Sequence, residues 1–276
     1  MEFGRCKLGS LFLRGPFMND TTGILSTRNP TTRVVFWLAV IVLLCNVVLL
    51  FPAAWWWLTG TNVLPHAFVR HFDLNAESNL FAWYSSLLLT LASITALLNF
   101  VLDSFGGRQT WRRYGWLWFS AVMLFLSMDE IATIHESIDE FTTSRLRGSA
   151  TWTIWAAGYG RTWILVYAPG ILAVIGSISF VFMNLGRTAP GLALCALGGM
   201  TLWIISLGLE FSQTDLCMAG TRDPGQELRC LQGEVLLEES AEVFGTTGLL
   251  IAFVWYAHQR VTEWVALPRR HGRIAD

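Results

Sequence analysis

One short segment carries the residues that could do chemistry. Within Ser127–Glu136, Asp129 and Glu130 are followed by His135 and Glu136, directly after an uncharged and mostly apolar stretch of fifteen residues. A charged side chain at the centre of a bilayer costs roughly 2.5–3.5 kcal/mol on insertion scales, and charges at such positions usually have a function. This segment is therefore the first candidate for a functional site.

Further acids lie at the ends of two later apolar stretches. Glu210 ends one stretch, and Glu238 and Glu242 precede the last one, residues 243–256. A helix needs about 20 residues to cross a membrane, so each stretch must include some of its acids to cross. At 1.5 Å per residue, Asp129 and Glu242 come out roughly 22 and 21 Å from the inner side. We therefore expect acids of three helices at one level of the outer leaflet.

The directions of these side chains follow from helix geometry if each span is one continuous helix. At 100° per residue, Asp129 and Glu136 share one face. His135 lies about 120° and Glu130 about 100° from Asp129. The acids of the last span share a face with small residues, which let membrane helices approach closely. We therefore expect that face to point into the bundle, and Glu130 to point away from the site.

Carboxylates combined with an imidazole favour a divalent metal, Zn, Mn or Fe, as the cofactor, and helical bundles can supply such ligands from several helices. A metal lowers the pKa of bound water toward 7 and so produces a hydroxide nucleophile. This chemistry predicts a hydrolase-like membrane enzyme that acts on a lipid or lipid-linked substrate. The expected metal ligands are Asp129, His135, Glu210 and Glu238, and the expected catalytic residues are Glu136 and Glu242.

Two other interpretations of the same residues stay open. Clustered acids that bind no metal cannot all remain ionised, and carboxylate–histidine chains relay protons in transporters. The protein could then be a proton- or ion-coupled transporter, with Thr90, Asn99 and Ser120 continuing the path inward. In the third interpretation the acids only form hydrogen bonds inside the bundle of a structural or accessory membrane protein.

The composition places the chain in a membrane. Of its 276 residues 53% are hydrophobic and 14% are charged, and the mean hydropathy is +0.47, whereas soluble domains have about 25% charged residues. The formal net charge of −1 gives no basis for binding nucleic acid. The expected partner is the lipid bilayer, and the expected location is the bacterial inner (plasma) membrane.

Apolar stretches predict an all-α integral membrane protein with a six-helix transmembrane bundle. Residues 1–31 form a cytoplasmic segment, residues 32–258 the spanning domain and residues 259–276 a cytoplasmic tail. Basic residues are more frequent on the side of the two ends, so both termini are predicted to be cytoplasmic. The expected spans are Val34–Leu58, Asn79–Leu102, Tyr114 to about Thr133, Thr162–Leu185, Gly191 to about Glu210, and about Glu238–Tyr256.

Tryptophans and cysteines add two expectations about the span ends. Trp55, Trp111 and Trp116 lie near predicted boundaries, where tryptophan is typical of the membrane–water interface.

Cys217 and Cys230 flank the last outer loop. That side is the oxidising one in the predicted topology, which favours a disulfide between them. The loop would then be closed near Glu210.

Overall fold

The structure is a computed structural model, and it describes residues 30–74, 79–106, 110–146, 162–186, 189–218 and 224–271. Within these ranges the chain is helical and forms no strand. Five helices are long and apolar enough to cross a membrane. The large apolar side chains of the first one, such as Phe36 and Val47, are mostly exposed, as expected for a surface that faces lipid. The fold is therefore an all-α, multi-pass membrane fold.

The long helices follow the order of the predicted spans, but their lengths differ from the predicted ones. The five spanning candidates lie in α1, α3, α4, α8 and α9. The fourth predicted span corresponds to α7, whose apolar part, Pro169–Met183, is short for a crossing helix, so the count of six and the side of the termini stay predictions. The elements are α1 Pro30–Thr59, α2 His66–Val69, the 3-10 helix η2 Arg70–Phe72, α3 Leu80–Phe105, α4 Thr110–Ala132, α5 Ile134–Leu146, α7 Thr162–Gly186, α8 Pro190–Met218 and α9 Pro224–His271.

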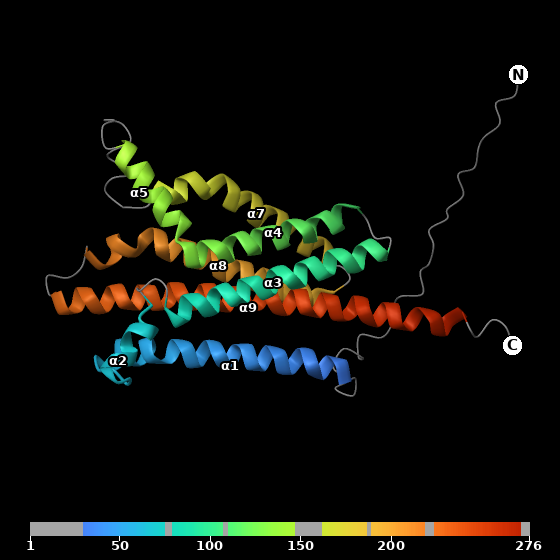
Figure 1. Ribbon diagram of the computed structural model, residues 1–276, viewed down its shortest axis with the longest axis horizontal. Helices are drawn as coiled ribbons and strands as arrows, with labels where there is room; N and C mark the ends of the chain where they lie inside the picture. The colour runs from blue at the N-terminus through green and yellow to red at the C-terminus, as the bar shows by residue number, and fades with distance from the viewer. Residues whose placement is uncertain are drawn as a thin grey trace, which may run out of the picture.

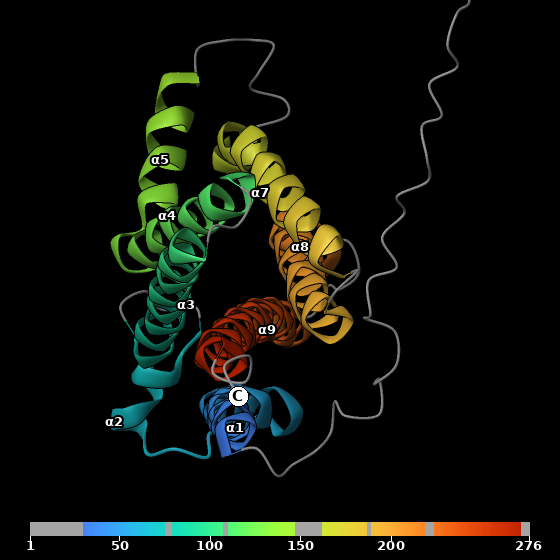
Figure 2. The same cartoon turned by 90° about the vertical axis from the view of Figure 1, so that its right-hand side faces the viewer.

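Helix α9 is the central element of the bundle. It runs along the length of the molecule (Figure 1), and the view along its axis shows α1, α3 and α8 around it (Figure 2). It packs against all three of these helices. The helix has 48 residues and passes without a break through residue 258, where the spanning domain was predicted to end. One rigid element therefore connects the acids near its start to the opposite end of the bundle.

Glycines bring α8 and α9 into backbone contact. A Cβ atom on Gly199 would lie 2.6 Å from the carbonyl oxygen of Gly245 and 3.1 Å from the backbone nitrogen of Leu249. A Cβ atom on Gly248 would lie 3.2 Å from the carbonyl oxygen of Cys195. Small residues permit this close approach. In lipid, where the hydrophobic effect does not attract helices to each other, the resulting van der Waals contacts supply the attraction. The predicted small-residue face of the last span thus packs against α8.

The largest buried side chains form an aromatic core in the half of the bundle away from the acids. Trp116 and Phe119 of α4, Phe182 of α7 and Phe253 of α9 are fully buried, and their rings lie 5.3–6.2 Å apart. The expectation that Trp116 is an interfacial anchor was therefore wrong. Trp116, Phe119 and Met123 follow helical spacing and face the core together.

Buried polar contacts tie the spanning helices together at two levels. The Asn46 amide of α1 donates to the Thr247 hydroxyl of α9 at 2.9 Å and accepts from the Tyr84 hydroxyl of α3 at 2.6 Å. At the end of the bundle away from the acids, Arg260 Nε donates to the Asp103 carboxylate at 2.9 Å, and the Tyr256 hydroxyl donates to it at 2.7 Å. Asp103 is fully buried, so these donors compensate a charge that would otherwise be costly.

We predict that Gly199→Ala destabilises the protein and that Gly198→Ala does not. The new methyl group at Gly199 meets backbone atoms, which cannot move aside, whereas nothing lies within 4 Å of a Cβ on Gly198. Overpacking of this kind costs about 1–3 kcal/mol. Thermal unfolding in nanodiscs should show a lower midpoint for Gly199→Ala only. Equal midpoints for the two variants would contradict the backbone contact.

Candidate functional site

The acidic motif contains a helix break that the sequence pattern does not reveal. Helix α4 ends at Ala132, Thr133 has φ +46°, and α5 begins at Ile134. A left-handed conformation is unfavourable for a β-branched residue. Asp129 offsets that cost, because its Oδ1 accepts a hydrogen bond from the His135 N–H at 2.9 Å. Its carboxylate therefore caps the start of α5, as side-chain oxygens do at helix N-termini.

The same break brings Asp129 and His135 together. His135 Nδ1 lies 3.0 Å from Asp129 Oδ2, so both carboxylate oxygens contact this one residue. The expectation that His135 points about 120° away from Asp129 was wrong, because it assumed a continuous helix. The positive φ at Thr133 turns the chain and places His135 over the carboxylate.

Three acids determine the charge of His135, which lies beyond the spanning part of α4. Burial by itself would lower the pKa of His135, but the hydrogen bond to Asp129 and the negative charges of Asp129, Glu210 and Glu136 raise it to about 9. The imidazole is therefore protonated at neutral pH. An imidazolium is a donor and cannot bind a metal until it loses its proton.

Carboxylates from four helices meet at this end of the bundle. We call the acidic cluster the set Asp129, Glu130, His135, Glu136, Glu210, Glu238, Glu239 and Glu242. Glu130 interacts electrostatically with Glu242, Asp129, Glu210 and His135. Glu242 of α9 in turn interacts electrostatically with His135 and Asp129 of the motif. All six predicted site residues thus lie in one electrostatic environment.

Two members of the acidic cluster were not predicted as site residues. Glu130 was expected to point away, yet it interacts with acids of α8 and α9. Glu239 interacts with Glu242, Glu130, Glu238 and Glu210. The adjacent pair Glu238–Glu239 was the sequence signal that could have identified it. Neighbouring residues lie only about 100° apart on a helix, so two adjacent acids widen the acidic face.

The acidic cluster has no preformed metal site. No three His, Cys, Asp or Glu side chains among those the structure describes are grouped closely enough to hold a metal ion. His135 is bonded to Asp129 instead of being aligned with the acids of α8 and α9. The metal-binding roles of Asp129, His135, Glu210 and Glu238, and the catalytic roles of Glu136 and Glu242, therefore stay predictions.

The structure describes the side chain of one of the two cysteines that were predicted to form a disulfide. Cys230 of α9 is disulfide-bonded, while Cys45 and Cys195 are free. The side chain of Cys217 lies outside the described part of the chain, so its pairing with Cys230 stays a prediction.

We predict that His135 titrates near pH 9 and that Asp129→Asn moves its pKa back toward about 6.5. The ion pair stabilises the folded state fully below pH about 6.5, and this contribution is lost as the pH rises through about 9. Nitrogen-15 NMR of histidine-labelled protein measures the titration, with His135→Gln assigning the signal. Glu140→Gln, which changes an exposed acid of α5, is the matched control. A titration of His135 at or below pH 6.5 in the unsubstituted protein would contradict the ion pair.

Comparison with known proteins identifies a family but no characterised relative. Neither the curated proteins nor the solved structures give a match. Residues 31–257, which include every predicted site residue, match the family described as "Domain of unknown function (DUF8692)". The chain therefore belongs to the DUF8692 family.

Proposed function

We propose that the protein is a proton- or ion-coupled membrane transporter and that the acidic cluster is its cation-binding site. One observation carries the proposal: carboxylates of α4, α8 and α9 interact with one another inside helices that are otherwise apolar enough to span a membrane. Ionisable groups in such positions commonly belong to ion paths and proton relays.

The charge balance of the acidic cluster favours a cation that can enter and leave. The cluster contains seven carboxyl groups and one imidazole: Asp129, Glu130, Glu136, Glu210, Glu238, Glu239, Glu242 and His135. Ionised carboxylates are costly away from water, and like charges near one another increase the cost. A bound proton or metal cation removes part of both costs. Exchange of that cation with the outer solution would give the cluster two charge states.

A row of polar side chains between α3 and α4 supports a path inward. The Ser127 hydroxyl, two residues before Asp129, lies 2.8 Å from the hydroxyls of Ser86 and Thr90. Further inward, Ser93 and Ser120 lie 3.1 Å apart. Hydroxyl groups both donate and accept hydrogen bonds, so such a row can pass a proton. The polar residues Thr90 and Ser120, noted in the sequence, thus lie between the cluster and the aromatic core.

Further polar side chains lie between this row and the ion pair of Asp103 with Arg260. Asn99 Nδ2 donates to the carbonyl oxygen of Phe253 at 3.1 Å. Asn99 Oδ1 and Trp116 Nε1 are buried and have no hydrogen-bond partner among the described residues. One is an acceptor and the other a donor, so a water between α3 and α4 could satisfy both. The next polar group along α3 is Asp103, one turn further on, which bonds to Arg260 and Tyr256.

A metal-dependent membrane hydrolase is the second candidate. Its support is that the predicted ligands Asp129, Glu210 and Glu238, from three helices, interact electrostatically with Glu130 or Glu239. Binding would require loss of the His135 proton and a rearrangement of side chains. A bound metal would supply a hydroxide near neutral pH, and a lipid-linked substrate would reach it from the outer leaflet.

We predict protein-dependent proton movement in liposomes, with Glu242→Gln lowering the rate to that of protein-free liposomes. Glutamine keeps the size of the side chain but binds no proton, so it interrupts the acidic cluster. The measurement is the fluorescence of a trapped pH-sensitive dye after an external acid pulse. Glu140→Gln, outside the cluster, should retain the full rate. A rate in the unsubstituted protein equal to that of empty liposomes would refute a proton path.

Metal analysis separates the two candidates. If the hydrolase is correct, protein purified at neutral pH without chelator retains about one Zn, Mn or Fe per chain, and Asp129→Asn and Glu238→Gln lose it. We expect the proton movement instead to persist after treatment with a chelator. Proton movement that stops on chelation and returns on addition of a single metal would favour the metal site.

A further inference from the structure

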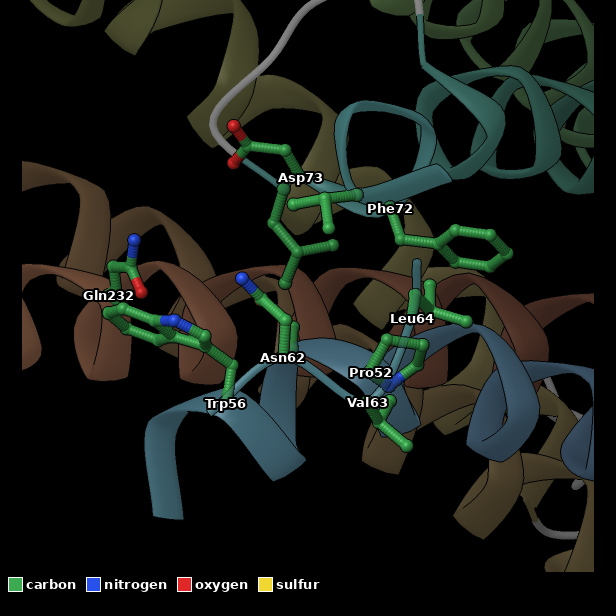
Figure 3. A pocket seen from close by; sticks show the side chains of 11 residues that line it. Pro52, Trp56, Asn62, Val63, Leu64, Phe72, Asp73 and Gln232 are labelled. Carbon is green, nitrogen blue, oxygen red and sulfur yellow. The ribbon is translucent and has the colours of Figure 1, made fainter. Parts of the chain in front are cut away.

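A second site lies between α1, η2 and α9, apart from the acidic cluster. It is a half-open cavity of about 170 Å³ under the connection between α1 and α3 (Figure 3). That volume is smaller than the roughly 300–1,000 Å³ of a site that encloses a whole small molecule. The cavity can therefore hold one part of a larger ligand. Its lining is Pro52, Ala53, Trp56, Asn62, Val63, Leu64, Val69, Phe72, Asp73, Leu74 and Gln232.

The lining has a polar and an apolar half. In Figure 3 the polar ends of Asp73, Asn62 and Gln232 lie toward one side with Trp56, while the apolar side chains, Phe72 among them, lie toward the other. Among the described residues that line it there is one acid and no basic side chain. A carboxylate and two carboxamide oxygens accept hydrogen bonds from an ammonium group, and the face of a tryptophan attracts a cation.

The fold fixes the acid of this cavity in place. The backbone oxygen of Asp73 accepts a hydrogen bond from the Asn79 amide at 2.6 Å, and Asn79 Oδ1 caps α3 by accepting from the Ala82 N–H at 2.6 Å. The position of Asp73 thus depends on the start of a spanning helix instead of on loop conformation alone. A fixed backbone at Asp73 reduces the entropy that is lost when a ligand binds to its side chain.

A basic group lies outside the lining but close in the chain to one of its residues, Gln232. The Arg229 guanidinium lies 2.5 Å from the position that a Cβ on Gly60 would take, two residues before Asn62. Gly60 has φ +70°, a conformation that glycine adopts without strain, and the missing side chain leaves room for the guanidinium. Arg229 precedes Gln232 by one turn of α9, so the two side chains share a face. Arginine binds phosphate groups well because its donors form a planar fork.

We propose that this cavity binds a phospholipid whose headgroup carries an ammonium group, with the amine at Asp73 and Trp56 and the phosphate at Arg229. The cavity lies where α1 ends in Trp55, Trp56 and Trp57, a position typical of the membrane–water interface. The apolar half takes the start of an acyl chain. Binding at this site is independent of cation binding in the acidic cluster, so its test stands apart from the proposed function.

Native mass spectrometry of the full-length protein tests the proposal. Protein from nanodiscs that contain phosphatidylethanolamine and phosphatidylglycerol in equal amounts should retain phosphatidylethanolamine after mild delipidation. Because Asp73→Asn removes the charged hydrogen-bond acceptor, it should reduce retention by at least about tenfold. Trp56→Leu should reduce it as well. Trp55→Leu, which removes an exposed interfacial tryptophan outside the lining, is the matched control and should retain the lipid.

A soluble competitor separates a lipid from a free amine. Glycerophosphoethanolamine, which has the headgroup but no acyl chain, should not displace the retained lipid, because it lacks contacts with the apolar half. Displacement by this compound would show that the site takes a soluble amine and would overturn the lipid assignment. Equal retention of the two lipids, or unchanged retention in Asp73→Asn, would overturn the proposal altogether.

Discussion

The structure depends on compensating carboxylate charge where water is scarce. Acids from α4, α5, α8 and α9 share one end of the bundle, and each of them would be costly there alone. The fold groups them within electrostatic range of each other and pairs Asp129 with His135. At the opposite end, the charge of Asp103 is compensated by two hydrogen-bond donors, Tyr256 and Arg260. The fixed pair at Asp103 stabilises the fold, whereas the acidic cluster is the proposed cation-binding site.

The break at Thr133 separates a membrane-spanning helix from a polar one. Helix α4 is apolar through most of its length, while α5 contains acids and a basic residue near its end. The carboxylate of Asp129 serves both helices, because it lies in the last turn of α4 and caps the first turn of α5. Its contact with His135 therefore couples the charge of the acidic cluster to the local backbone conformation.

Helix α9 connects the three polar regions of the molecule. Gln232 lines the cavity near its start, Glu239 and Glu242 belong to the acidic cluster, and Arg260 pairs with Asp103 near the opposite end. Close glycine contacts hold this helix against α8, and buried amide and hydroxyl contacts hold it against α1.

The sequence by itself determined the helical membrane class and the order of the helices. These follow from hydropathy and from a constant rise per residue, which are local properties. Tertiary structure decided the directions of the side chains. The positive φ of Thr133 placed His135 on Asp129, and the packing of α9 against its neighbours brought Glu130 and Glu239 into the cluster. Trp116 entered the core because its face of α4 meets α7 and α9. Directions depend on helix breaks and on neighbours distant in sequence, and hydrophobic periodicity contains neither.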